Sequence, residues 1–217
     1  MKRLVLPRLY VILDPALLTI PETDCAQQLA AAGVRLLQYR NKQASARELF
    51  ESSKRLASLL LPLGVTLVVN DRADVARAVD ASGVHVGQED LEPEGARFVI
   101  GQEKLLGVSA HNEEQFAKMA ATSADYVAIG PVFPTYSKSN PDPVVGLEMI
   151  RRVRALTEKP IVAIGGITLD RAAEVLRAGA DTVAVISDIL RAPDPGKRAK
   201  QFLDILGAAQ PAAAGGA

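Results

Sequence analysis

The sequence predicts a single (β/α)8 TIM barrel, an α/β fold, on three observations. Short apolar segments alternate with helix-like segments eight times along the 217 residues, which is the size of a compact barrel. These segments are apolar on both faces, which is typical of parallel strands that are covered on each side by other elements. Small residues recur in the turns from helix to strand, as in Ala-Ala-Gly-Val at 31–34 and Ala-Gly-Ala-Asp-Thr at 178–182.

Several of the expected elements carry a local signal for their ends. Gly33 ends the first helix, Ser45 and Glu48 form a capping box at the second, and Pro93 stands in the first turn of the fourth. The expected strands are 8–13, 34–42, 65–71, 84–88, 104–109, 126–130, 161–165 and 182–186. The expected helices are 24–32, 45–61, 73–81, 93–100, 112–121, 146–157, 169–178 and 196–206.

A doubly wound open sheet is the alternative arrangement of these elements. It is disfavoured because no G-x-G-x-x-G turn follows the first strand. Residues 1–207 are therefore expected to form one barrel domain. The last residues, 208–217, contain no large apolar side chain and are expected to be a disordered tail.

Composition argues against several classes of protein. Lys and Arg total 25, as do Asp and Glu, so nothing attracts the chain in bulk to nucleic acid or to an anionic membrane. No apolar run approaches the ~18 residues of a membrane span, and Pro7 interrupts the first apolar residues too early for a signal peptide. The single cysteine, Cys25, fits a reducing compartment and is expected to be a small apolar filler. We expect a cytoplasmic protein, and the sequence leaves a homo-oligomer open.

The end of the second strand carries an unusual set of polar residues. Gln38, Arg40 and Lys42 alternate onto one face, with Tyr39 and Asn41 on the other. Two cations at the end of a buried strand need an anion. In a barrel, the active site lies at the carboxyl ends of the strands. Polar residues or glycines follow the other strands too: Asp14, Asn70-Asp71, His85 to Asp90, Ser109 and His111, Gly130, Gly165-Gly166 and Ser187-Asp188.

Asp71 and Asp90 follow neighbouring strands and could together hold a divalent cation. Carboxylates with ligand phosphate oxygens are the usual coordination of Mg²⁺. The alternative is that Asp71 caps the next helix and Asp90 makes a surface turn. Facing Arg40 and Lys42, the two carboxylates fit a magnesium-bound diphosphate.

A second anion site is indicated at the ends of the seventh and eighth strands. Gly165-Gly166 and Ile186-Ser187 match the phosphate site that many barrels build there. A structural turn that needs positive φ is the alternative. The loop 131–143 is the longest in the chain and offers hydroxyls and a cation, so we expect a functional lid rather than a surface insertion.

The two histidines support no hydrolase. His85 follows the alternation of the fourth strand toward the site, and His111 is expected to cap the next helix. Neither has a nucleophile beside it in the sequence, so a Ser/His hydrolase is disfavoured. A structural role is the alternative for each.

The strand ends together resemble those of the thiamine-phosphate synthase family. The resemblance runs in order from about residue 10 to 190. It rests on six segments: Gln38-Tyr39-Arg40-Asn41-Lys42, Asn70-Asp71-Arg72, 83–90 (GVHVGQED), 107–111 (GVSAH), 130–138 (GPVFPTYSK) and 163–167 (AIGGI).

The resemblance implies substrates and roles for these residues. The family condenses 4-amino-2-methyl-5-(diphosphooxymethyl)pyrimidine with 4-methyl-5-(2-phosphooxyethyl)thiazole, in some members carboxylated, and releases diphosphate by a dissociative route. Arg40, Lys42, Lys138 and Ser109 would be catalytic, and Asp71 and Asp90 would bind Mg²⁺. The pyrimidine diphosphate would lie on Gln38, Arg40, Lys42, Asn70, Ser109 and Lys138. The thiazole phosphate would lie on Thr135, Ser137, Gly166, Ile186 and Ser187. Tyr39, Asn41, His85 and Tyr136 complete the predicted substrate-binding set.

Two rival functions remain. Thiazole tautomerases resemble this chain in the phosphate loops but have histidine where Pro131 stands here. A catalytically silent barrel that senses a phosphorylated metabolite would keep the Gly166 and Ser187 site without needing Lys42 or the two aspartates.

Overall fold

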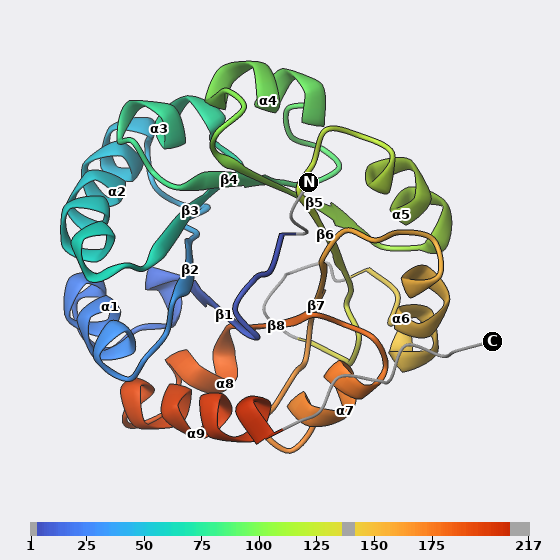
Figure 1. The fold of residues 1–217 in the computed structure, drawn as a ribbon. Coiled ribbons are helices and arrows are strands. Elements are labelled where there is room, and N and C mark those ends of the chain that lie inside the picture. Colours follow the sequence, from blue (N-terminus) through green and yellow to red (C-terminus); the bar gives the residue numbers. More distant parts are fainter. Residues whose placement is uncertain (1–3, 136–141, 209–217) are drawn as a thin grey trace.

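The chain folds into a closed barrel of eight parallel strands in the order β1 to β8 (Figure 1). The structure is a computed structural model that describes residues 4–135 and 142–208. Strand β1 pairs with β8, so the sheet has no edge and the doubly wound alternative is excluded. The (β/α)8 prediction is confirmed. The strands are β1 (Leu9–Leu13), β2 (Leu36–Tyr39), β3 (Thr66–Asn70), β4 (Gly83–Val86), β5 (Leu105–Ala110), β6 (Tyr126–Ile129), β7 (Ile161–Ile164) and β8 (Thr182–Val185).

Helices form the outer ring around the strands (Figure 1). They are α1 (Glu22–Ala31), α2 (Ala46–Leu60), α3 (Ala73–Ala78), α4 (Pro93–Ile100), α5 (Glu113–Ala120), α6 (Gly146–Arg154), α7 (Ala172–Arg177), α8 (Ser187–Leu190) and α9 (Pro195–Ala208), with 3-10 turns η1 (Pro15–Leu17) and η2 (Leu61–Leu63). The four-residue helix α8 was not predicted. Ala208 is the last residue of α9, and the rest of the predicted tail lies outside the described residues.

Local signals placed most element ends within a few residues. The capping box is confirmed: the Glu48 N–H donates to Ser45 Oγ, and the Ser45 N–H donates to the Glu48 carboxylate at 2.8 Å. Strand β2 ends at Tyr39 rather than at residue 42, because the Asn41 side chain accepts from the N–H groups of two following residues and closes a turn. The expected cap of α5 by His111 is wrong, since the neighbouring Asn112 accepts the N–H of Gln115 at 2.8 Å.

Two apolar layers hold the barrel together. The larger layer lies between the strands and the helices and includes Cys25, whose thiol pKa burial raises to about 11. That unreactive position fits the expected filler role. The smaller layer fills the barrel interior with Leu6, Tyr10, Ile12, Leu36, Val68, Tyr126, Ala128, Val162 and Ala184. The interior is therefore packed, and a substrate reaches only its rim.

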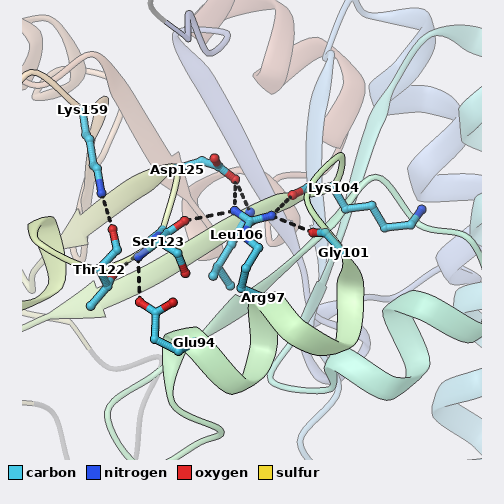
Figure 2. Close-up of polar contacts among 10 residues, drawn as sticks. Glu94, Arg97, Gly101, Lys104, Leu106, Thr122, Ser123, Asp125 and Lys159 are labelled. Carbon is cyan, nitrogen blue, oxygen red and sulfur yellow. Dashed lines mark hydrogen bonds and ion pairs between the residues drawn. The ribbon is translucent and has the colours of Figure 1, made fainter.

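A buried arginine fastens the amino-terminal ends of β5 and β6, opposite the predicted site. Figure 2 shows the Arg97 side chain of α4 reaching the carboxylate of Asp125 and nearby carbonyl groups. Arg97 donates to the carbonyls of Gly101, Lys104 and Ser123 at 3.0, 2.6 and 3.1 Å. Because every partner belongs to the scaffold, this cluster stabilises the fold rather than the site. Within the described part of the chain, no helix is long and apolar enough to cross a membrane.

Candidate active site at the carboxyl rim of the barrel

Parallel strands bring their carboxyl ends to one rim, and Gln38 lies just inside it. Its side chain is 3% exposed, and Nε2 donates to the hydroxyl of Tyr10 at 2.9 Å. Tyr10 and Gln38 stand on adjacent strands, β1 and β2. Gln38 therefore joins the barrel interior to the rim.

Arg40 has an anionic partner within the protein. Its guanidinium forms an ion pair with Asp14, at the end of the adjacent strand β1. Asp14 is buried, and its other carboxylate oxygen accepts the Ala16 N–H at 3.1 Å. The anion that Arg40 was expected to need is therefore supplied within the protein, by Asp14. Sequence reasoning noted Asp14 at a strand end but missed its pairing, which the adjacency of β1 and β2 would have indicated.

Lys42, Asp71 and Asp90 come together, as predicted. The Lys42 ammonium forms an ion pair with Asp71, whose side chain also contacts Asp90. Lys42 is half exposed, so it is not the buried cation that strand alternation suggested. Asp90 accepts the Gly87 N–H at 2.8 Å and so also closes the turn offered as its alternative role. Asp71 does not cap α3, since Arg72 occupies that position and no side chain caps the helix.

The neighbouring carboxylates of Asp71 and Asp90 repel each other when both are ionised. Burial raises the pKa of Asp71, and the nearby Asp90 carboxylate adds to that effect while Lys42 opposes it. The donor set fits a divalent cation, which binds carboxylate oxygens and would relieve the repulsion. Among the described residues, no group of three or more His, Cys, Asp or Glu is placed to hold a metal alone. Any metal here would need further oxygen ligands from the substrate or water.

His85 and Ser109 form the third part of the rim. His85 Nε2 lies 2.8 Å from Ser109 Oγ, and His85 stands beside Asn70 in the register of β3 and β4. Gln88 Nε2 donates to the backbone carbonyl of Ser109 at 2.5 Å. Asn70 and Ser109 are partly exposed, while His85 is buried. The Ser109 hydroxyl is thus presented at the rim by a buried imidazole.

Tyr39 and Asn41 lie away from these residues. Tyr39 is fully buried on the outer face of β2, and its hydroxyl donates to Glu22 of α1 at 2.7 Å. The Asn41 side chain belongs to the turn after β2 and lies 3.4 Å from the Tyr39 hydroxyl. The structure therefore does not bring either side chain to Gln38, although both are in the predicted binding set.

The two glycines after β7 are packed under the loop that follows β6. Gly165 and Gly166 have φ of 100° and 63°. A Cβ on Gly165 would lie 2.5 Å from Pro131 Cβ, and one on Gly166 would lie 2.4 Å from the Pro134 carbonyl oxygen. This close packing and the positive φ explain both glycines without a ligand, as the structural-turn alternative has it. The predicted Ile186 and Ser187 follow β8 at the same rim, Ser187 as the first residue of α8.

The loop after β6 is only partly described. Thr135 is its last described residue on the first side, and the predicted Tyr136, Ser137 and Lys138 lie outside the described residues. His111 Nδ1 lies 2.7 Å from the Gly130 carbonyl oxygen at the start of the loop and 3.4 Å from the Asp142 carboxylate beyond it. His111 thus joins the two described ends of this loop.

Sequence reasoning also missed a buried polar chain beneath the rim. The hydroxyls of Tyr10 and Tyr126 lie 3.1 Å apart, and the Tyr126 hydroxyl lies 3.1 Å from His85 Nδ1. With Gln38 at one end and Ser109 at the other, five side chains from five strands form one hydrogen-bonded chain. The available signal was the inward position of a tyrosine on both β1 and β6.

Comparisons with known proteins agree on one family. A family model described as thiamine monophosphate synthase matches residues 9–189. The thiamine-phosphate synthase of Koribacter versatilis is 55% identical over 94% of this chain and 97% of its own, and that of Chloroflexus aurantiacus is 43% identical over 94% of each. The solved thiamine phosphate pyrophosphorylase from Pyrococcus furiosus superposes with a TM-score of 0.82 at 38% identity, covering 92% of this chain and 95% of that one.

Proposed function

Because this chain belongs to the thiamine monophosphate synthase family, we propose that the rim residues described above carry that activity. The enzyme condenses a pyrimidine diphosphate with a thiazole phosphate to give thiamine phosphate and diphosphate, in thiamine biosynthesis. The observation that carries the site assignment is the meeting of Lys42, Asp71 and Asp90 at the rim.

Arg40 and Lys42 bind the diphosphate of the pyrimidine substrate. Both cations are held at the rim by carboxylates, Arg40 by Asp14 and Lys42 by Asp71. These pairs keep the cations oriented in the free enzyme, so a diphosphate meets positioned donors. Asn70 and Ser109 add polar groups at the neighbouring strand ends, and Lys138 supplies a third cation.

Asp71 and Asp90 would hold Mg²⁺, with phosphate oxygens completing its coordination. The contact between the two carboxylates and the raised pKa of Asp71, caused first by burial, support this assignment. When bound, the cation would supply positive charge for the leaving diphosphate. Lys42 beside Asp71 would then be released to bind the same diphosphate.

The reaction needs charge stabilisation rather than a general base. The diphosphate departs first and takes the bonding electron pair, leaving a pyrimidine-methyl cation that the thiazole nitrogen attacks. Arg40, Lys42 and Lys138 stabilise the charge that builds on the leaving group. Gln38, which lies just inside the rim, orients the pyrimidine, and His85 holds the Ser109 hydroxyl toward the same substrate. The sequence places no nucleophile beside a histidine, but the fold brings His85 Nε2 to 2.8 Å from Ser109 Oγ. Because the diphosphate departs first, the reaction does not need this pair to form a covalent intermediate.

The thiazole phosphate binds on the opposite side of the rim, at Thr135, Ser137, Gly166, Ile186 and Ser187. The positive φ of Gly166 turns the backbone at the end of β7, where barrels commonly bind phosphate. The turn can serve both the packing of the neighbouring loop and the anion. We also propose a cytoplasmic location, since Cys25 is free and buried.

The decisive experiment is turnover by the purified protein with Mg²⁺, the pyrimidine diphosphate and the thiazole phosphate in its carboxylated and uncarboxylated forms. We expect stoichiometric release of diphosphate and formation of thiamine phosphate. Lys42→Ala and Asp71→Ala should each lower kcat/KM by about 100-fold or more. Lys54→Ala is the control, because Lys54 lies on α2 beside Phe50 and outside the site.

The rival functions give different results in the same assay. A sensor barrel would bind the thiazole phosphate tightly without releasing diphosphate, and a tautomerase would isomerise the carboxylated thiazole without needing the pyrimidine. Full activity of the Lys42→Ala or Asp71→Ala protein would refute the site assignment while leaving the family intact.

A further inference from the structure

We propose that Tyr126 is a positioning residue that fixes the tautomer of His85 and thereby makes the Ser109 hydroxyl a hydrogen-bond donor toward the substrate. The inference rests on the proposed function only in its last step, the contact of Ser109 with substrate. Its geometric part concerns the buried chain Gln38, Tyr10, Tyr126, His85 and Ser109, which links the barrel interior to the rim.

The donor at Gln38 decides which way each hydrogen bond in this network is donated. Gln38 Nε2 donates to the Tyr10 hydroxyl oxygen at 2.9 Å, so Tyr10 must place its own proton elsewhere. Among the described residues, its hydroxyl has two hydrogen-bond partners, Gln38 Nε2 and the Tyr126 hydroxyl at 3.1 Å. Tyr10 therefore donates to Tyr126. Burial raises the pKa of both phenols, so both keep their protons at neutral pH.

The same reasoning passes the direction on to His85. Tyr126 accepts from Tyr10 and donates to His85 Nδ1, 3.1 Å away. A neutral imidazole that accepts at Nδ1 carries its proton at Nε2. His85 Nε2 therefore donates to Ser109 Oγ across 2.8 Å. Among the described residues of this hydrogen-bond network, none then accepts the Ser109 proton, and it can be donated to an oxygen of the diphosphate.

If the hydrogen bonds from Ser109 to Tyr10 were all donated in the opposite direction, one proton would have no acceptor. If Ser109 donated to His85, then His85 would donate to Tyr126 and Tyr126 to Tyr10. Tyr10 is a buried residue, 1% exposed, and its hydroxyl would face only the Gln38 amide N–H group and the incoming Tyr126 proton. A buried hydroxyl that cannot donate is unfavourable, so the forward direction is preferred.

Packing holds the Tyr126 ring in the position that this chain needs. Tyr126 lies beside Gly107 in the register of β5 and β6, and a Cβ on Gly107 would lie 2.1 Å from Tyr126 Cζ. The ring is stacked on His85, with centroids 5.6 Å apart and an interplanar angle of 30°. It meets Tyr10 edge-on at 6.2 Å and 78°. The absence of a side chain at Gly107 thus gives the Tyr126 phenol access to the His85 imidazole.

The tautomers can be read directly by nitrogen NMR, because the chain contains two histidines. His111 is the internal reference: its Nδ1 faces the Gly130 carbonyl at 2.7 Å and must carry the proton. In the wild-type protein, at a pH well above the usual histidine pKa, we expect Nε2–H at His85 and Nδ1–H at His111. An Nδ1–H tautomer at His85 would overturn the inference.

The Tyr126→Phe variant removes the hydroxyl and keeps the ring. We expect His85 to lose its preference for Nε2–H while His111 is unchanged. With the fixed tautomer lost, kcat should fall about tenfold and KM should change little, because the Ser109 donor matters most as charge builds on the leaving group. Thr182→Val is the control: it removes another buried hydroxyl, which donates to the Pro7 carbonyl at the opposite end of the barrel.

Different results would refute the proposed function and the positioning role of Tyr126. Absence of turnover by the wild-type protein would refute the proposed function whatever the tautomers are. Wild-type turnover with an unchanged His85 tautomer and unchanged kcat in Tyr126→Phe would refute the role of Tyr126 alone. Equal losses of kcat in Tyr126→Phe and Thr182→Val would show a general effect of destabilisation and also contradict it.

Discussion

Arg97 and Asp125 form an ion pair of 2.7 Å at the amino-terminal ends of the strands, and Arg154 and Asp181 repeat it at the same distance. In each pair the carboxylate also accepts a backbone N–H from the start of the intervening strand: that of Leu106, the second residue of β5, at 2.7 Å and that of Ile161, the first residue of β7, at 2.8 Å. The two arrangements are related by a shift of two βα units. The same arrangement of an arginine, an aspartate and a strand N–H therefore stabilises the amino-terminal end of the barrel at two places.

Arg97→Ala should strongly destabilise the protein. The change removes a buried guanidinium from three carbonyl groups and from the Asp125 carboxylate, which is 34% exposed. Breaking such a partly buried pair should cost up to about 3 kcal/mol. Arg151→Ala is the matched control, because its 3.0 Å pair with Glu148 is exposed and worth under about 1 kcal/mol. Urea unfolding of both variants measures the difference, and equal losses would contradict the buried role of Arg97.

Gly166→Ala should destabilise the loop contact between β6 and β7 more than its φ alone requires. Gly64 has a similar positive φ, with no described atom within 4 Å of an added Cβ, so Gly64→Ala isolates the backbone cost of about 1 kcal/mol. At Gly166 the added Cβ also meets the Pro134 carbonyl at 2.4 Å. Thermal unfolding should show the larger loss for Gly166→Ala, and equal losses would mean that the loop yields freely.

Asp71→Asn should stabilise the metal-free protein at neutral pH. Burial raises the folded-state pKa of Asp71, so the folded protein binds this proton more tightly than the unfolded chain. Stability is therefore lost as the pH rises from the unfolded pKa through the folded one, and the full penalty remains above it. We expect the variant to melt higher than wild type at about pH 7 and equally at about pH 3.

Asp170→Asn is the control of opposite sign. The Thr168 hydroxyl donates to Asp170 and lowers its pKa, so that carboxylate stabilises the folded protein above its unfolded pKa. Its removal should lower the melting temperature slightly at neutral pH. A melting temperature of Asp71→Asn below that of wild type at neutral pH would show that the Lys42 ion pair outweighs burial.

Ser45→Ala should lower stability by about 1 kcal/mol, because α2 loses the acceptor for the Glu48 N–H. Ser45→Asp keeps an acceptor at the cap and should recover most of the loss. The free energy of unfolding measured in urea distinguishes the two variants. If both lose the same amount, the cap contributes less than the local packing of the turn.

Interactions close in the sequence were the predictable part of the fold. Helix α4 has the predicted bounds, with Pro93 in its first turn, and the capping box joins residues three positions apart. The extent of β2 was overestimated because the Asn41 turn competes with the strand after Tyr39. The same short-range signals missed α8, which has only four residues and no side-chain cap.

The sequence predicted where most of the site residues lie in the barrel, but it predicted few of their hydrogen-bond and ion-pair partners. Strand ends gave the rim and the meeting of Lys42 with Asp71, because neighbouring parallel strands end together. The pairing of Arg40 with Asp14 joins residues 26 positions apart, and the pair of tyrosine hydroxyls spans 116. The predicted strand order makes β1 and β2 neighbours, but it does not give the depth of each side chain, and β1 and β6 are not neighbours in the barrel, so the two tyrosine hydroxyls meet only across its interior.

The closure of the barrel has a consequence for its biosynthesis. Val11 of β1 pairs with Val185 of β8. During translation, β1 therefore lacks its second neighbouring strand until almost the whole chain has been synthesised. Until then the nascent sheet has two open edges, which are the parts of a sheet most prone to pairing with other chains. Ribosome-bound chains that stop before residue 182 should therefore need chaperone protection, and release of the final strand should end that need.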